Sequence, residues 1–361
     1  MSGTIKKTKI EDLGFSAFFE SSLKELGLDE SSVARVIAEY KGIYRVRCIA
    51  GEYLAKITGK QMFKALSRED YPAVGDWVAI TELNKEQAVI NRILPRKTIL
   101  KRKYINKQDE QIIAANIDVA FIIESVGKDY NLNRLERYFV LAKAGNIAPA
   151  IILNKVDLIS DEELNLIICR IKDRFPGVDV IPTSAITERG LIELTRYIVK
   201  GKTYCFLGSS GVGKSSMINK LLGSDAIKIS EINLHTGKGK HTTTNREIYF
   251  LENGGIVIDN PGMREVGMGE SNAGMMDVFA DVTALSKNCK YADCTHMCEP
   301  GCAILNAVEY EELDKSQYLN YLKLKKETEY YNMTELEKRR TGRKFGKYVK
   351  TTLAQLKEFE S

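Results

Sequence analysis

The feature that most constrains this chain is the glycine-rich segment 208–215, Gly-Ser-Ser-Gly-Val-Gly-Lys-Ser. It directly follows the apolar run 203–207, which is typical of a buried strand, and helical spacing follows it. In that context the spacing predicts a phosphate-binding loop, whose backbone N–H groups converge on a nucleotide's phosphates while the next helix presents its positive end. A glycine-rich turn without a ligand is disfavoured, because lysine and serine both follow the last glycine. The residues expected at the phosphates are Gly208, Ser209, Ser210, Gly211, Val212, Gly213, Lys214, Ser215 and Ser216.

Two of these side chains have separate tasks. We expect Lys214 to neutralise β- and γ-phosphate oxygens and Ser215 to bind Mg²⁺ through its hydroxyl.

A second segment, Asn-Lys-Val-Asp at 154–157, ends the apolar run 147–153 and indicates which base is bound. A carboxylate at Asp157 can accept hydrogen bonds from N1–H and N2–H₂ of guanine, which adenine lacks on that edge. Alone, the tetrapeptide could be an ordinary strand-to-helix loop. Ser-Ala after the next strand pattern supports guanine, because it offers a backbone N–H to the guanine oxygen. We expect Asn154 to tie neighbouring loops and Lys155 to lie along the base, and the full base site comprises Asn154, Lys155, Val156, Asp157, Ser184 and Ala185.

Two further segments suit a metal and a γ-phosphate. Asp259 ends a strand pattern and begins Asp-Asn-Pro-Gly, where it is placed to hold Mg²⁺ through water and the N–H of Gly262 can sense a γ-phosphate; a simple turn is the alternative. Segment 237–244, Gly-Lys-Gly-Lys-His-Thr-Thr-Thr, has the glycines and hydroxyls of a nucleotide-dependent switch. One of its threonines, with Thr243 as the candidate, would complete the magnesium shell.

The order of these motifs is the reverse of that in ordinary GTPases, where the phosphate loop comes first. Here residues 154–157 precede residues 208–215, so the sequence predicts a circularly permuted domain. Strand and helix patterns alternate from residue 116 to residue 259, which predicts a mainly parallel sheet covered on both faces.

The flanking segments differ in pattern. Residues 1–31 predict a short helical lead-in that stops at Gly27, and residues 32–97 carry short β-type runs that predict a small barrel. The barrel segment is basic, as is the stretch from Arg96 to Lys107, which suits RNA or an ordinary solvated linker about equally. Its aromatic residues could stack on bases or could belong to the core, and they are Tyr44, Tyr53 and Trp77.

The seven cysteines include four between residues 289 and 302. Cys289, Cys294 and His296 have the spacing of ligands for tetrahedral Zn²⁺, and on spacing alone either Cys298 or Cys302 can be the fourth; buried reduced thiols without a metal are the alternative. Residues 276–361 otherwise read as helical and charged. A basic run there suits RNA phosphates or a solvated helix face, and it comprises Lys338, Arg339, Arg340, Arg343, Lys344, Lys347 and Lys350.

Together these motifs resemble the ribosome small-subunit-dependent GTPase A family, also called RsgA or YjeQ, over residues 33–305. The resemblance implies an N-terminal OB-fold at 32–97, a circularly permuted α/β P-loop GTPase domain at 98–275 and a mostly helical zinc-binding domain at 276–361. It implies Cys289, Cys294, His296 and Cys302 as zinc ligands, with Cys298 spare. One departure is Asn260, where relatives usually carry Thr or Ser.

The same resemblance implies late maturation of the 30S subunit, with 16S rRNA and GTP or GDP as partners and the protein acting as a monomer. Met263 stands where classical GTPases have a water-orienting Gln, so we expect slow intrinsic hydrolysis and stimulation by the subunit. His241 is the candidate for positioning water, and its match to the family's histidine before the threonines favours this over a plain switch residue. The alternatives are an RNA-binding assembly factor that uses GTP only as a sensor, and an adenine-specific ATPase.

Composition sets the remaining expectations. The 361 residues suggest two or three domains, and the net charge of +5 is mild. No run approaches the roughly 18 apolar residues of a membrane span, and no export signal is evident, so we expect a cytoplasmic protein with reduced thiols.

Overall fold

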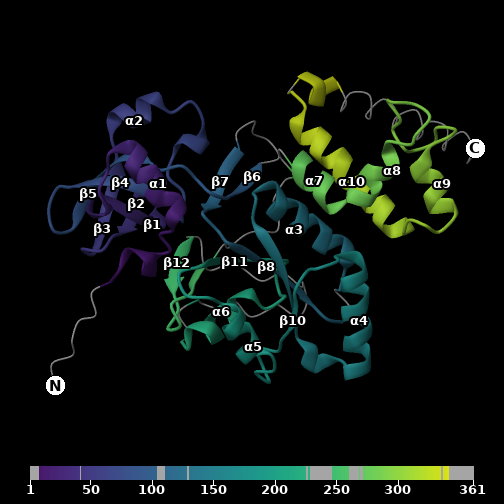
Figure 1. Ribbon diagram of the computed structural model, residues 1–361, viewed down its shortest axis with the longest axis horizontal. Coiled ribbons are helices and arrows are strands. Elements are labelled where there is room, and N and C mark those ends of the chain that lie inside the picture. Colours follow the sequence, from purple (N-terminus) through teal and green to yellow (C-terminus); the bar gives the residue numbers. More distant parts are fainter. Residues whose placement is uncertain are drawn as a thin grey trace, which may run out of the picture.

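The structure is a computed structural model in which a barrel, a central sheet and a helical C-terminal region follow one another along the chain (Figure 1). It confirms the predicted multidomain organisation. The residues it describes are 8–40, 42–103, 110–127, 130–224, 227, 246–259, 268, 271–334 and 336–340.

The lead-in is helical, as predicted. It comprises 3₁₀ turns η1 (Ile10–Leu13) and η2 (Glu30–Ser32) around helix α1 (Ala17–Leu26). Gly27 ends α1 with φ 61° and donates its N–H to the carbonyl oxygens of Leu23 and Lys24, so the predicted stop is confirmed.

Five strands close into the predicted barrel. Strand β1 pairs with β2 and β4, β2 with β3, β3 with β5 in parallel, and β5 with β4. Helix α2 and the turn η3 connect β3 to β4. The bounds are β1 (Val33–Tyr40), β2 (Ile43–Arg47), β3 (Glu52–Ile57), α2 (Gly59–Lys64), η3 (Arg68–Asp70), β4 (Trp77–Glu82) and β5 (Gln87–Ile93).

The three aromatic residues that the sequence offered as stacking candidates belong to the core. Tyr44, Tyr53 and Trp77 are 2%, 8% and 0% exposed. Phe15 of the lead-in packs edge-on against Trp77, with ring centroids 4.8 Å apart. Of the two interpretations of these residues, core packing is the one that the structure confirms, because Tyr44 and Tyr53 belong to the cluster inside the barrel and Trp77 to the cluster between the barrel and the lead-in.

A hairpin follows the barrel, where the sequence indicated only a basic stretch. Strands β6 (Ile99–Lys103) and β7 (Glu110–Ala115) pair antiparallel. Each strand is so short that its sequence pattern could not be distinguished from that of a linker.

The central sheet has the order β10-β9-β8-β11-β13-β12, in which only β12 is antiparallel. Side chains of β8 alternate between two cores, with Ile122 on the α3 side and Phe121 on the opposite side, so both faces are covered as predicted. The strands are β8 (Val119–Ser125), β9 (Ala148–Asn154), β10 (Val180–Pro182), β11 (Thr203–Leu207), β12 (Glu247–Phe250) and β13 (Ile256–Asp259). The helices are α3 (Leu132–Ala144), η4 (Val156–Leu158), α4 (Asp161–Arg174), α5 (Leu191–Tyr197) and α6 (Lys214–Leu222).

The C-terminal region is mostly helical, as expected, and packs on α3 (Figure 1). Arg137 of α3 forms a two-pronged ion pair with Glu327, each N–O distance being 2.6 Å. Within the described part of the chain, no helix combines the length and apolarity that crossing a bilayer requires. The helices are α7 (Asn272–Val278), α8 (Ala280–Ser286), α9 (Ala303–Glu309) and α10 (Lys315–Asn332).

A buried arginine joins the barrel to the central sheet. Arg35 of β1 is 1% exposed and donates hydrogen bonds to the carbonyl oxygen of Leu13 at 2.6 Å and to Oγ1 of Thr203 at 2.8 Å. Burial lowers the pKa of Arg35 to about 10, so the guanidinium stays charged at neutral pH. The lead-in, the barrel and β11 therefore meet at one cation.

Replacing Arg35 measures how much this cation contributes to the stability of the fold. Arg35→Met keeps the volume but leaves the Leu13 carbonyl and the Thr203 hydroxyl without their donor, so we expect a loss of about 2–4 kcal/mol, seen as a lower Tm. Arg47→Met is the control, because Arg47 lies over the Phe250 ring with its side chain 33% exposed and should cost under about 1 kcal/mol. An Arg35→Met variant as stable as the unmodified chain would contradict this view.

Candidate nucleotide site and metal centre

Three loops at the carboxyl edge of the sheet are held together by one amide. Asn154, the last residue of β9, is 1% exposed. Its Nδ2 donates to the carbonyl oxygen of Val212 at 2.8 Å, and its Oδ1 accepts from Oγ1 of Thr183 at 3.2 Å. Segments 154–157, 183–185 and 208–215 are thus brought to one place, although they are far apart in the sequence.

The glycine-rich segment curls around the start of α6. Gly213 has φ 99°, and a Cβ there would lie 2.3 Å from Nδ2 of Asn154, so only glycine permits both the turn and the approach of the loops. Nζ of Lys214 donates to the carbonyl oxygens of Gly208 and Ser209, at 2.9 and 2.5 Å. The ammonium therefore lies inside the loop, where a phosphate bound by the backbone N–H groups would meet it.

The segment predicted to read the base, 154–157, presents its carboxylate to solvent. Lys155 takes the left-handed conformation at φ 63°, which turns the chain so that Asp157 is exposed on η4. The loop that follows β10 is held by hydrogen bonds within it, because Oγ of Ser184 accepts from the N–H groups of Ile186 and Thr187. Ala185, the next residue of this loop, is half-buried.

Asp259 ends β13 close to the phosphate loop and is 6% exposed. Burial raises the pKa of its carboxyl to about 6, while the charge of Lys214 opposes that rise. A buried carboxylate in this position suits a divalent cation, because the positive charge of the ion would compensate for the hydration that the carboxylate loses on burial.

One ion pair of this site was not anticipated from the sequence. Arg134 of α3 donates to Oγ of Ser209 at 3.1 Å and lies 3.4 Å from the carboxylate of Glu124, which is fully buried at the end of β8. The signal was present: a glutamate after Phe-Ile-Ile in a strand buried on both faces requires a partner. This pair connects α3 to the phosphate loop.

Several predicted residues lie outside the described residues. They are His241 and Thr243 of segment 237–244, and Asn260, Gly262 and Met263 after Asp259. The basic residues from Arg343 onward are also outside. Their assignments stay predictions.

A second cluster lies in the C-terminal region. The ligand atoms of Cys289, Cys294, His296 and Cys302 all lie within 4.8 Å of one another. Sγ of Cys289 and Nδ1 of His296 are 3.6 Å apart, and Sγ of Cys302 is 3.7 Å from the same nitrogen. Ligands of a tetrahedral zinc, with Zn–S near 2.3 Å, are separated by roughly 3.7 Å, so this donor set fits the ion. Cys298 is exposed and lies outside the cluster, so the geometry groups Cys302 and not Cys298 with the other three side chains.

The cluster is anchored from the long helix. His296 has φ 65°, and its carbonyl oxygen accepts from the hydroxyl of Tyr318 on α10 at 2.7 Å. Glu299 accepts from the N–H groups of Thr295 and Met297, which closes the loop around the cysteines.

A phosphate loop and a guanine-type loop that meet in reversed chain order define a circularly permuted P-loop GTPase. A family model described as RsgA GTPase matches residues 93–269. A relative from Lactiplantibacillus plantarum, named small ribosomal subunit biogenesis GTPase RsgA 2, is 42% identical over 87% of this chain and 89% of its own. A Bacteroides thetaiotaomicron protein, named small ribosomal subunit biogenesis GTPase RsgA 1, is 37% identical over 89% and 90%.

Two solved structures have a similar fold. The crystal structure of YjeQ from Thermotoga maritima superposes with a TM-score of 0.59 at 26% identity, covering 81% of this chain and 96% of that chain. YloQ, described as a circularly permuted GTPase, gives 0.56 at 25% identity, covering 84% and 96%. The chain belongs to the RsgA GTPase family.

The amide that joins the loops can be removed. Asn154→Ala leaves the Val212 carbonyl without that donor, so the two loops lose their register and affinity for GDP should fall at least about tenfold, which is roughly 1.4 kcal/mol. Titration calorimetry measures it. Asn253→Ala is the control, since that amide donates to Thr195 and Ile198 away from the loops and should leave GDP affinity unchanged. Equal affinities for the unmodified chain and Asn154→Ala would refute the role given to this side chain.

Proposed function

We propose that this chain hydrolyses GTP to GDP and phosphate while it assists late maturation of the small ribosomal subunit. The observation that carries the proposal is the Asn154 junction, which places a guanine-type loop and a phosphate loop at one edge of the sheet. The names of the relatives supply the ribosomal partner. The small subunit, and through it 16S rRNA, is the proposed macromolecular partner of a cytoplasmic, monomeric protein.

In the proposed site, one group of residues binds the guanine base and another binds the phosphates. Asp157 accepts from the guanine edge, Lys155 lies along the base, and the backbone of 184–185 donates to the guanine oxygen. The loop 208–216 holds the phosphates, and Lys214 neutralises their charge. These groups bind the substrate and hold its γ-phosphate in place for attack by water.

Magnesium fits this arrangement. Ser215 and the buried carboxylate of Asp259, with Thr243, would hold Mg²⁺, which supplies charge neutralisation at the β- and γ-phosphates. Gly262 offers its N–H to the γ-phosphate. His241 positions the attacking water, because Met263 cannot.

Zinc is the ion proposed for the cysteine cluster. Three thiolates and one imidazole fill all four positions, so the ion stabilises the C-terminal region and takes no part in hydrolysis. We propose the domain limits 1–31, 32–97, 98–275 and 276–361 for the lead-in, barrel, GTPase and zinc-binding parts.

The test of function is hydrolysis of GTP with and without purified 30S subunits. We expect slow intrinsic turnover and stimulation of about tenfold or more by the subunit, because ordering of catalytic groups by a partner is worth orders of magnitude. His241→Ala should bind GTP normally but lose the stimulation in single-turnover kinetics. Absence of stimulation would favour the sensor alternative, and wild-type hydrolysis by His241→Ala would remove that residue from the mechanism.

The metal has its own test. Zinc content by mass spectrometry should be one ion per chain, and Cys302→Ser should lose it with a lower Tm, because a three-ligand site binds the ion weakly. Cys298→Ser is the matched control and should keep both zinc and stability, since its thiol is exposed and outside the cluster. Loss of zinc in Cys298→Ser with retention in Cys302→Ser would contradict the assignment.

A further inference from the structure

One cation reaches segment 208–215 from a helix outside it. Arg134, in the first turn of α3, donates from Nη1 to Oγ of Ser209, the second residue of the segment, at 3.1 Å. The carbonyl oxygen of the same serine accepts from Nζ of Lys214 at 2.5 Å. Ser209 is therefore contacted by an arginine through its side chain and by the lysine of the segment through its main chain.

The end of β8 brings this arginine and the start of the segment together. A Cβ at Gly208 would lie 2.4 Å from the carbonyl oxygen of Ile123, so only glycine lets the chain pass this close to β8. Glu124, the next residue of β8, is fully buried, and its Oε1 lies 3.4 Å from Nη1 of Arg134. Because a buried carboxylate is stable only beside a compensating charge, Glu124 fixes the guanidinium next to the first residues of the segment.

The two halves of segment 208–215 are thus held from different elements of the fold. Asn154 of β9 holds the second half, and Arg134 of α3 holds the first. Nζ of Lys214, in the second half, donates to the carbonyl oxygen of Ser209 in the first. The position of the ammonium that is proposed to neutralise the β- and γ-phosphates consequently depends on where Ser209 is held.

We propose that Arg134 is a positioning residue for GTP hydrolysis, an inference that rests on the proposed function. It acts through Ser209, which it holds so that the ammonium of Lys214 lies where the β- and γ-phosphates are bound. Loss of Arg134 should weaken nucleotide binding and slow hydrolysis more strongly, because negative charge on the phosphate oxygens is redistributed in the transition state. The alternative is that Arg134 only compensates the charge of Glu124 and contributes to stability alone.

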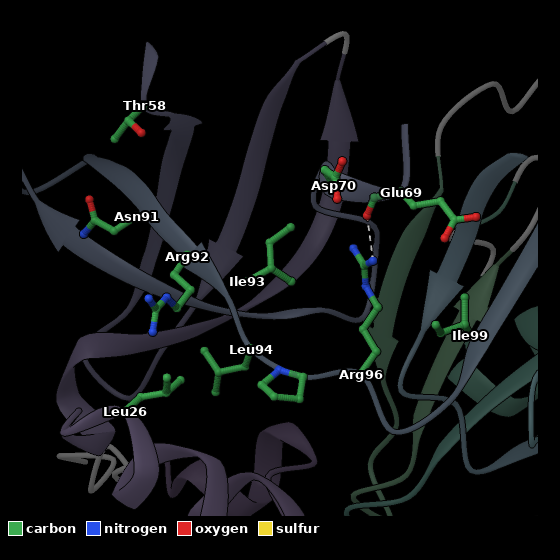
Figure 2. Close-up of a pocket in the computed structure, with 11 residues that line it drawn as sticks. Leu26, Thr58, Glu69, Asp70, Asn91, Arg92, Ile93, Leu94, Arg96 and Ile99 are labelled. Atoms are coloured by element: carbon green, nitrogen blue, oxygen red, sulfur yellow. Dashed lines mark hydrogen bonds between the residues drawn. The ribbon is translucent and has the colours of Figure 1, made fainter. Parts of the chain in front are cut away.

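The barrel contains a similar ion pair that provides a matched control. Asp76 is fully buried and pairs with Arg96 at 2.7 Å. Figure 2 shows the same guanidinium donating to the carbonyl oxygen of Glu69, at 2.7 Å. In both pairs an arginine joins a buried carboxylate to a second segment of chain, but the segment that Arg96 contacts belongs to the barrel and not to the nucleotide site.

The deciding variant removes both charges of the Arg134 pair. Arg134→Met/Glu124→Gln leaves no unpaired buried carboxylate, and it is compared with Glu124→Gln alone, so that the effect of losing the carboxylate cancels. We expect GDP affinity, measured by titration calorimetry, to fall roughly five- to tenfold, and the single-turnover rate at saturating GTP to fall roughly tenfold or more. Equal affinities and equal rates in the two variants would show that Arg134 only compensates Glu124 and would overturn the proposal.

Two controls separate this effect from a general loss of stability. Arg96→Met/Asp76→Asn removes the ion pair of the barrel and should lower Tm while leaving GDP affinity and the hydrolysis rate unchanged. Lys143→Met removes an exposed ion pair with Asp277 from the other end of α3 and should change neither affinity nor rate. Slowing of hydrolysis in these controls as large as that caused by loss of Arg134 would contradict a specific role for the arginine.

Ser209→Ala tests the route by which Arg134 acts, because it removes the oxygen that the guanidinium contacts and leaves the main chain of the segment intact. We expect this variant to slow hydrolysis about as much as loss of Arg134 does. Adding Ser209→Ala to Arg134→Met/Glu124→Gln should cause little further loss, since both changes remove the same contact. Additive losses would overturn the action of Arg134 through Ser209.

GDP binding by the unmodified chain separates this proposal from the proposed function. If the unmodified chain binds GDP and hydrolyses GTP while loss of Arg134 has no effect, the positioning role alone is overturned. If the unmodified chain binds no GDP, the proposed function is overturned together with it.

Discussion

The structure depends on one buried amide that joins loops from three parts of the chain. Asn154 hydrogen-bonds to the phosphate loop through Val212 and to the next loop through Thr183, and Gly213 is glycine because any side chain would meet that amide. Since a buried polar group must be satisfied, the amide fixes the position of segment 154–157 relative to segment 208–215, the two segments proposed to bind the base and the phosphates. The permuted order of the motifs does not disturb this arrangement, because the contact joins the carboxyl ends of β9 and β11, which lie on either side of β8 in one parallel sheet whatever the connection between them.

The same edge of the sheet is connected to both flanking parts of the molecule. Strand β12 follows segment 237–244 and pairs with β1 of the barrel, where the hydroxyl of Tyr40 donates to Glu247 at 2.5 Å. On the other side, α3 contacts segment 208–215 through Arg134 and the C-terminal helix α10 through Arg137. Segment 208–215 is thus connected to the C-terminal helices through α3, and the central sheet is connected to the barrel through β13 and β12.

Local patterns carried most of what the sequence could predict. Buried strands such as β11 and the stop at Gly27 follow from spacing and residue type within one element, and the structure confirms them. The sequence indicated that Glu124 needs a partner, but neither Arg134 as that partner nor the Arg35 junction could be predicted, because each contact joins residues whose proximity exists only after folding. The burial of Trp77 beneath the lead-in and the exposure of Phe63 on α2 were undetermined for the same reason, because each depends on whether another part of the folded chain covers the side chain.

The central claim is that the two loops grip a single guanine nucleotide, and base selectivity tests it most directly. Titration calorimetry of the zinc-loaded chain should show one GDP site, no measurable binding of ADP, and loss of GDP binding in Asp157→Asn. That variant should instead prefer xanthosine diphosphate, which carries an oxygen at C2 where guanine carries an amine, because an asparagine amide can donate to it. Absence of GDP uptake by the unmodified chain, or equal affinity for GDP and ADP, would contradict the account.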